Sequence, residues 1–194
     1  MKHFAMASLA AVLALATSCR LGSGGFALVS PAIRDDAILP AEFTGDGAGI
    51  SPPLAWRGAP AGTKAYALIM HHVDPQGMVK WYWVLYNIPL EAAALPKGAT
   101  GIGLQGTNSV NHRQEYAPPH SKGPGLKTYT CTLYALSEPV VPEVGPEQVT
   151  RELLLKAMAG KILGQAELTL SYTRPASAFA RDPTQAAPAP SSRP

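Results

Sequence analysis

The residues best suited to chemistry stand close together in the segment His71-His72-Val73-Asp74, where two imidazoles adjoin a carboxylate. Imidazole and carboxylate groups are good zinc ligands. However, successive residues of a strand point to opposite faces, so His71 and His72 cannot easily reach one ion. The only other imidazoles within the predicted domain are His112 and His120. We therefore expect neither a bound metal nor another cofactor.

Two other residues invite a catalytic interpretation. Ser51 would need an adjacent base and an oxyanion hole to act as a nucleophile, and no neighbour supplies them. We expect its hydroxyl to satisfy backbone groups at a turn. Lys127 could be a catalytic amine if buried, but a lysine beside aromatic residues can equally anchor an anion, and we favour the anchor. A hydrolase-like enzyme or a metal-binding protein using His72, Asp74 and Lys127 remains the competing hypothesis, although the enzyme lacks an evident nucleophile.

The elements that must position these residues are mostly strands. Gly and Pro divide the chain into short apolar pieces, which predicts strands joined by turns. Residues 64–70 are nearly all apolar and suit a central strand covered on both faces, and residues 81–88 are aromatic and β-branched. Further strands are predicted at 128–136 and 166–172. The aromatic side chains that we expect in the core are Trp81, Trp83, Tyr86 and Tyr134.

One helix is predicted in the C-terminal half. Pro146 suits a first helical position, apolar residues recur at helical spacing from Val149 to Ala157, and Gly160 provides a stop. Elsewhere, Cys131 is expected to be a small buried hydrophobe, because alternation places it on one face with other apolar residues. The polar segment 108–115, which contains His112 and Arg113, is expected to face solvent.

The N-terminus has the features of a secretory signal: a cationic start, an apolar run over residues 4–16, and small residues before Cys19. The apolar run is shorter than the roughly 20 residues of a membrane-spanning helix. Ala16, Thr17 and Ser18 before Cys19 resemble a bacterial lipobox, so we predict a signal peptide over 1–18 and lipidation of Cys19. The alternative is ordinary signal cleavage after Ala16.

The rest of the chain divides into a flexible tether over 19–25, one domain over 26–174, and a disordered Ala/Pro-rich tail over 175–194. The whole chain has a formal charge of +3. Removing residues 1–18 removes one Lys, so the charge falls by one to +2. This value is too small to indicate nucleic-acid binding or attraction to an anionic membrane surface. We expect membrane contact only through the lipid anchor.

Four ordered motifs carry a family resemblance. Gly49-Ile-Ser-Pro-Pro-Leu-Ala-Trp56 opens the series, followed by Trp83-Val-Leu-Tyr-Asn-Ile-Pro89, Gly123-Pro-Gly-Leu-Lys-Thr-Tyr129 and Leu133-Tyr-Ala-Leu136. Together they resemble the bacterial, Raf kinase inhibitor-like branch of the phosphatidylethanolamine-binding protein family. The resemblance implies a mainly β, sandwich-like fold with few short helices and a small cavity that binds anions or phosphorylated head groups.

The resemblance also implies which residues line that cavity, and several depart from the family pattern. His72 and Asp74 stand where the family has two Asp residues of a turn, while Tyr82 and Lys127 replace its two histidines. These exchanges make the pocket less negative and change its expected pH response. The implied ligand-binding residues are His72, Asp74, Tyr82, Pro118, His120, Lys127 and Tyr129.

These features predict a binding protein and not an enzyme. We expect an exported, periplasm-facing lipoprotein that holds a small anionic ligand or phosphorylated head group. Arg20 after Cys19 favours the outer membrane by the usual bacterial sorting rule, and a soluble periplasmic or secreted protein is the alternative. Because members of the family also regulate kinases and proteases by binding them, a protein partner is implied as well.

Overall fold

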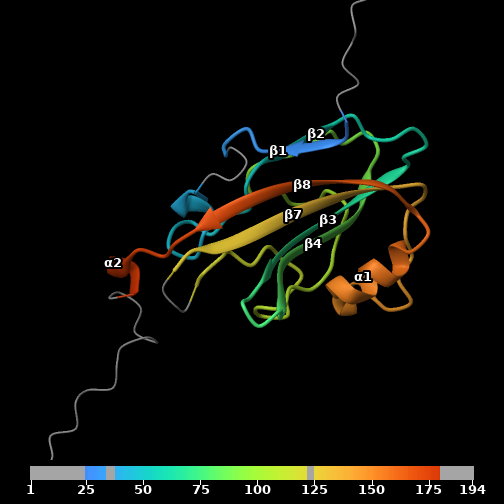
Figure 1. Ribbon diagram of the computed structural model, residues 1–194. Helices are drawn as coiled ribbons and strands as arrows, with labels where there is room; N and C mark the ends of the chain where they lie inside the picture. Colours follow the sequence, from blue (N-terminus) through green and yellow to red (C-terminus); the bar gives the residue numbers. More distant parts are fainter. Residues whose placement is uncertain (1–24, 34–37, 122–124, 180–194) are drawn as a thin grey trace, which may run out of the picture.

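Two antiparallel β-sheets form the framework of the protein in the computed structural model, which describes residues 25–33, 38–121 and 125–179. The larger sheet has the strand order β6-β4-β3-β7-β8 and the smaller one β1-β2-β5. Figure 1 shows β1 and β2 on one side of the larger sheet and α1 on the other. The strands are β1 (Ala27–Val29), β2 (Leu54–Arg57), β3 (Ala65–Val73), β4 (Val79–Pro89), β5 (Ala94–Leu95), β6 (Leu104–Gln105), β7 (Lys127–Leu136) and β8 (Ile162–Tyr172).

The mainly β fold and the four strands predicted from the sequence are confirmed. β3 is the central strand of the larger sheet and is buried on both faces, as its apolar composition predicts. Tyr66, Leu68 and Met70 pack into the core beneath the smaller sheet, whereas Ala67 and Ile69 pack beneath α1. The short strands β1, β2, β5 and β6 were not predicted, because two to four residues are too few to show a period of two.

The predicted helix exists but begins later than Pro146. Pro146–Gln148 form a 3-10 turn, and α1 spans Arg151–Met158. The hydroxyl of Thr150 accepts a hydrogen bond from the backbone N–H of Leu153 at 3.3 Å, so Thr150 is the N-cap. Val149 is extended, and its carbonyl accepts from the N–H of Thr107 at 2.8 Å. This tertiary hydrogen bond takes Val149 out of the helix.

A short helix lies at the start of the predicted tail. Ala176–Phe179 form α2, and disorder of the tail stays a prediction. Alanine is the best helix former, and α2 contains two alanines in four residues. The other predictions for the termini, namely the signal peptide, lipidation of Cys19 and disorder over 180–194, lie outside the described residues. Among the described helices, which also include the 3-10 turn Ala41–Phe43, none has the length and apolarity needed to cross a membrane.

Two buried side chains behave as expected. The hydroxyl of Ser51 accepts a hydrogen bond from the N–H of Ala99 at 3.1 Å, which confirms its role in satisfying backbone groups. Cys131 is fully buried as a free thiol, and burial raises its pKa to about 12. It is therefore a packing residue and not a reactive thiol.

Candidate functional site

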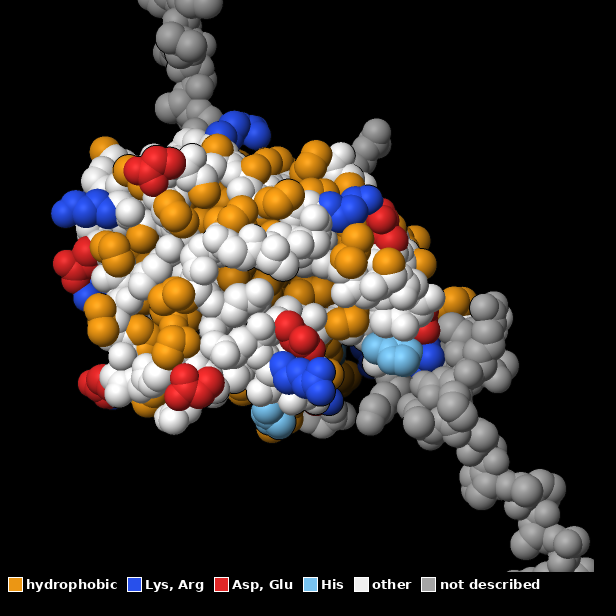
Figure 2. Space-filling model, turned by 180° about the vertical axis from the view of Figure 1, so that it is seen from behind, with side chains coloured by type: hydrophobic (Ala, Val, Ile, Leu, Met, Phe, Trp, Pro, Cys, Tyr) orange, Lys and Arg blue, Asp and Glu red, His pale blue; other side chains and the backbone are white. Residues whose placement is uncertain are grey.

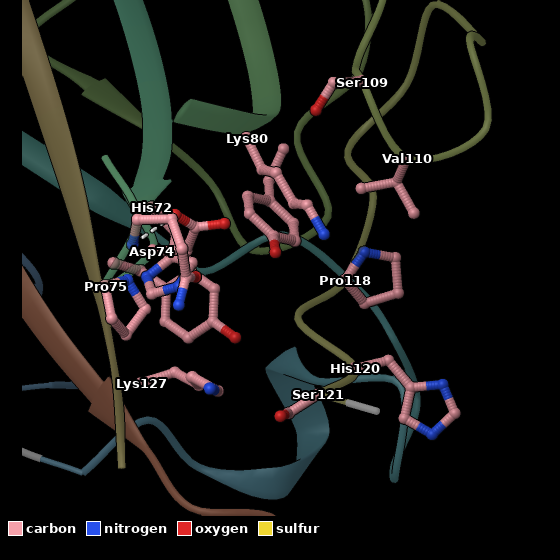
Figure 3. Close-up of a pocket in the computed structure, with 13 residues that line it drawn as sticks. His72, Asp74, Pro75, Lys80, Ser109, Val110, Pro118, His120, Ser121 and Lys127 are labelled. Atoms are coloured by element: carbon pink, nitrogen blue, oxygen red, sulfur yellow. Dashed lines mark hydrogen bonds between the residues drawn. The ribbon is translucent and has the colours of Figure 1, made fainter. Parts of the chain in front are cut away.

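A cavity of about 460 Å³ lies at the end of the larger sheet, where the β3–β4 turn, the start of β7 and the segment 109–121 meet (Figure 3). All seven residues predicted to bind a ligand line it, although their binding role stays a prediction. The complete lining consists of His72, Asp74, Pro75, Gln76, Lys80, Tyr82, Ser109, Val110, Pro118, His120, Ser121, Lys127 and Tyr129.

A β-bulge places Tyr82 and its neighbour Trp83 on the same side of the larger sheet. Met70 pairs with Trp83 and His71 pairs with Trp81, which leaves Tyr82 as an extra residue in β4. An extra residue of this kind locally redirects side chains. Tyr82 and Trp83 consequently both join the core beneath the smaller sheet, while Trp81 packs on the α1 side. The sequence carries no local sign of the bulge, although the family resemblance does place Tyr82 in the site.

The phenols of Tyr82 and Tyr129 lie next to each other in the cavity lining. Their rings meet edge to face with centroids 5.1 Å apart. Burial raises the pKa of both phenols, and the hydrogen bond between them raises the pKa of Tyr129 further while lowering that of Tyr82. Both hydroxyls belong to the cavity lining, where each can donate to or accept from a ligand.

His72 presents one defined nitrogen to the cavity. Its Nδ1 lies 2.8 Å from the carbonyl oxygen of Thr128. A carbonyl can only accept, so Nδ1 must carry the proton, and Nε2 is left for the cavity.

The neighbouring His71 lies on the other face of the sheet, as predicted. Burial and the nearby charge of Arg151 lower the pKa of its imidazole. In the described part of the chain, no three His, Cys, Asp or Glu side chains come close enough together to hold a metal ion.

Asp74 lines the cavity but also shapes the β3–β4 turn. Its Oδ1 accepts hydrogen bonds from the N–H groups of Gln76 at 3.0 Å and Met78 at 2.8 Å. Such side-chain to backbone bonds are typical of aspartate in turns. One carboxylate oxygen of the site is therefore committed to the backbone, a role that the sequence did not predict for Asp74.

Lys80 and Lys127 bring two ammonium groups to the cavity, from β4 and β7 (Figure 3). Among the described residues, neither lysine forms an ion pair or a side-chain hydrogen bond. Lys80 was not predicted from the sequence. Its spacing of two residues from Tyr82 in a strand was a usable signal, because such residues share a face.

A cluster of paired charges lies behind the cavity wall. Asp46 accepts hydrogen bonds from Nε of Arg174 at 2.8 Å and from the hydroxyl of Tyr172 at 2.6 Å, and Nε2 of His120 lies 3.3 Å from its Oδ1. Burial raises the pKa of Asp46, but the two hydrogen bonds and the positive charge of Arg174 outweigh burial and lower it overall. Arg174 also donates to the carbonyl of Ser121 at 3.4 Å.

This cluster holds the wall segment in place. The N–H of Gly45 donates to the carbonyl of Pro119 at 2.9 Å, and a Cβ on Gly45 would lie only 2.8 Å from the side chain of His120. Asp46 and Arg174 are 128 residues apart in the chain, so no local pattern could have linked them. Sequence reasoning found His120 but not the pair that positions it.

The chain is similar in sequence to several known proteins. The model of the family described as phosphatidylethanolamine-binding protein matches residues 29–173. A UPF0098 protein from Methanothermobacter thermautotrophicus is 34% identical over 151 residues, which cover 76% of this chain and 98% of that protein. A Mycobacterium tuberculosis protein described as "Putative lipoprotein LppC" is 32% identical over 146 residues, covering 75% of this chain and 71% of the relative.

Two solved structures are similar to this one. CT736 from Chlamydia trachomatis has a TM-score of 0.71 at 29% sequence identity, covering 78% of this chain and 99% of that structure. YbcL from E. coli has a TM-score of 0.69 at 25% identity, covering 77% and 99%. The family match over residues 29–173 includes every residue that lines the cavity.

Proposed function

The chain belongs to the phosphatidylethanolamine-binding protein family, and on that premise we propose that it is an exported binding protein that holds a small anion or phosphorylated head group in the cavity. The observation that supports this most directly is the presence in one concave site of two lysines, Lys80 and Lys127, that form no ion pair among the described residues. A charge that is drawn into a concave site is stabilised by an opposite charge. An anion would supply that charge.

The geometry of the donors fits an anion as well. The hydroxyl of Tyr82 and the ammonium groups of the two lysines line one cavity, whose size falls in the range of small-molecule sites. Figure 2 shows basic and acidic side chains interspersed with other residues over one face of the molecule. This mixed distribution favours a local anion site over recognition by a broad basic surface.

Binding is favoured over hydrolysis because two groups that could act as nucleophiles, the hydroxyl of Ser109 and the thiol of Cys131, are not available to a ligand. The hydroxyl of Ser109 donates to the carbonyl of Trp81 at 3.0 Å and accepts from its N–H at 2.8 Å, so it is occupied by backbone groups. Nor does the thiol of Cys131 line the cavity. A nucleophile would need an adjacent base to activate it.

We place this binding protein at a membrane through lipidation of Cys19, on the periplasmic side of the outer membrane. The small residues before Cys19 support this, as does the similarity to the relative described as "Putative lipoprotein LppC". Mass spectrometry of the protein extracted from membranes should give the mass of a chain that begins at an acylated Cys19. A chain that begins at Thr17 without an acyl group would contradict the anchor.

Thermal unfolding in the presence of anions tests the binding function. A ligand that binds only the folded state stabilises it by about 2.7 kcal/mol when present at 100 times its Kd. Phosphate or phosphoethanolamine should therefore raise the Tm of the wild type, and this rise should be lost in Lys127→Met. Lys64→Met removes an exposed lysine outside the cavity and should respond like the wild type. Equal anion-induced shifts in all three proteins would contradict the proposed site.

A further inference from the structure

An apolar surface lies where the domain begins. Phe26 and Pro60 are half-buried and lie over Gly164, because a Cβ on that glycine would be 2.9 Å from Cγ of Pro60 and 3.8 Å from Cδ1 of Phe26. Leu163 lies beside the turn that contains Pro60, since a Cβ on Gly62 would be 3.8 Å from its Cδ1. We call this surface the apolar end patch, and it consists of Phe26, Pro60, Leu163 and the exposed Ala61.

A β-bulge holds Leu163 at the surface. Ala135 pairs with Gly164 and Leu136 pairs with Ile162, which leaves Leu163 as an extra residue in β8. An extra residue of this kind redirects a side chain. The side chain of Leu163 is 42% exposed, and that of Ile162 before it is 41% exposed. The backbone thus presents large apolar side chains next to the first residues of the domain.

The apolar end patch is also the surface closest in sequence to the predicted lipid anchor. Six residues separate Cys19 from Phe26, and a fully extended chain between them spans at most about 25 Å. Phe26 therefore cannot lie farther than this from a membrane that holds Cys19. A short tether gives an effective concentration in the millimolar range, so even a contact with a Kd of about 1 mM is substantially formed.

The cavity lies at the opposite end of the larger sheet. Lys127 pairs with Tyr172 at the cavity, whereas Leu136 pairs with Ile162 beside the apolar end patch. β7 runs from one end to the other, and at about 3.3 Å per residue its ten residues span about 30 Å. Figure 1 shows the starts of β1 and β8 toward the upper right and the β3–β4 turn at the lower left.

We propose that the apolar end patch rests in the interfacial region of the bilayer that holds the anchor, so that the cavity opens at the far end of the domain into the aqueous space. This inference rests on the proposed lipidation of Cys19, and it adds a second membrane contact to the expected anchor. The contact is apolar, so it does not need the large positive charge that the chain lacks. The cavity consequently takes its ligand from solution and not from the membrane beneath the domain.

Fluorescence quenching by nitroxide-labelled lipids tests this orientation. The full-length lipoprotein is extracted from membranes and reconstituted in phosphatidylcholine vesicles, with a thiol-reactive fluorophore at Ala61→Cys or, in a second protein, at Met78→Cys. Met78 is 65% exposed in the β3–β4 turn, and the fully buried Cys131 should not react. The fluorophore at position 61 should be strongly quenched, whereas the one at position 78 should not.

A further substitution assigns the contact to the patch. With the fluorophore at position 61, Leu163→Asp should abolish the quenching, because a carboxylate enters an apolar contact without a partner. Val141→Asp is the matched control, since it changes an 87% exposed valine outside the patch and should leave the quenching intact. Flotation of each variant with the vesicles establishes that the anchor is retained, and far-ultraviolet circular dichroism establishes that the variant is folded.

The outcomes separate the orientation from the anchor on which it rests. If the protein floats with the vesicles but the two fluorophores are quenched equally or not at all, or if Leu163→Asp keeps the quenching, the orientation is wrong while the anchor stands. Energy transfer between copies labelled at position 61, without quenching by lipid, would show that a second copy covers the patch instead. If the protein does not float with the vesicles, both the anchor and the orientation are overturned.

Discussion

Two charged regions lie on either side of the same cavity wall, and they differ in how their charges are balanced. Behind the wall, Asp46 is matched within the protein by Arg174 and Tyr172. On the cavity side, Lys80 and Lys127 have no carboxylate partner among the described residues. The paired region therefore maintains the architecture, whereas the unpaired region is available to a ligand. Substitutions in the first should change stability, and substitutions in the second should change binding.

The largest effect on stability is expected from Arg174→Met. Removing the guanidinium leaves the Asp46 carboxylate in a buried position with its main counter-charge gone, and losing one partner of such a pair costs about 3 kcal/mol. Urea unfolding measures this loss. Lys127→Met is the matched control on the other side of the wall, and its free energy of unfolding should change by less than about 0.5 kcal/mol. Similar losses of unfolding free energy in the two variants would contradict the view that only the region behind the wall maintains the architecture.

Asp46 should also make the stability of the protein depend on pH in the acid range. The pKa of Asp46 is lower in the folded protein than its ordinary value of 3.8, so ionised Asp46 stabilises the fold above that value. This contribution should be lost as the pH falls through the depressed folded pKa. Asp46→Asn should therefore show a weaker decrease in stability below about pH 4 than the wild type, with Glu91→Gln, an exposed site, as the control. An unchanged acid profile in Asp46→Asn would show that Asp46 is not specially stabilised.

The smallest effect is expected from Tyr82→Phe. This change removes a hydroxyl that lines the cavity, and a single hydrogen bond contributes about 0.5 to 1.5 kcal/mol. Affinity for methyl phosphate should fall roughly twofold to tenfold, as measured by calorimetry. Tyr134→Phe is the matched control, because it removes the hydroxyl of a tyrosine on the α1 side of the sheet and should leave affinity unchanged. If Tyr82→Phe binds methyl phosphate as tightly as the wild type does, the hydroxyl of Tyr82 does not contribute to binding.

Much of the fold follows from the sequence because the long strands have strong local signals. β3 has an uninterrupted apolar run and β8 a clean alternation, and both patterns depend on burial of neighbouring residues. The start of α1 did not follow, because a tertiary hydrogen bond to Val149 outweighed the helix signal of Pro146. Short strands such as β5 and β6 depend on their partners and have no period of their own.

Some residues of the candidate site could be predicted from the sequence, and others could not. His72, Asp74, Tyr82 and Lys127 were predicted because each stands at a position that the family resemblance aligns with its cavity, and all of them line the cavity. Asp46 and Arg174 were not predicted, because their pairing exists only after the chain has folded. Residues that contact the cavity were thus easier to find than the distant pair that supports its wall.

Calorimetric titration of the double variant Lys80→Met/Lys127→Met with methyl phosphate at pH 8 measures directly whether the two lysines make the anion site. If they do, the folded double variant should show no binding at concentrations that saturate the wild type. If the double variant binds methyl phosphate as tightly as the wild type does, the cavity is not the anion site and the proposed function is contradicted.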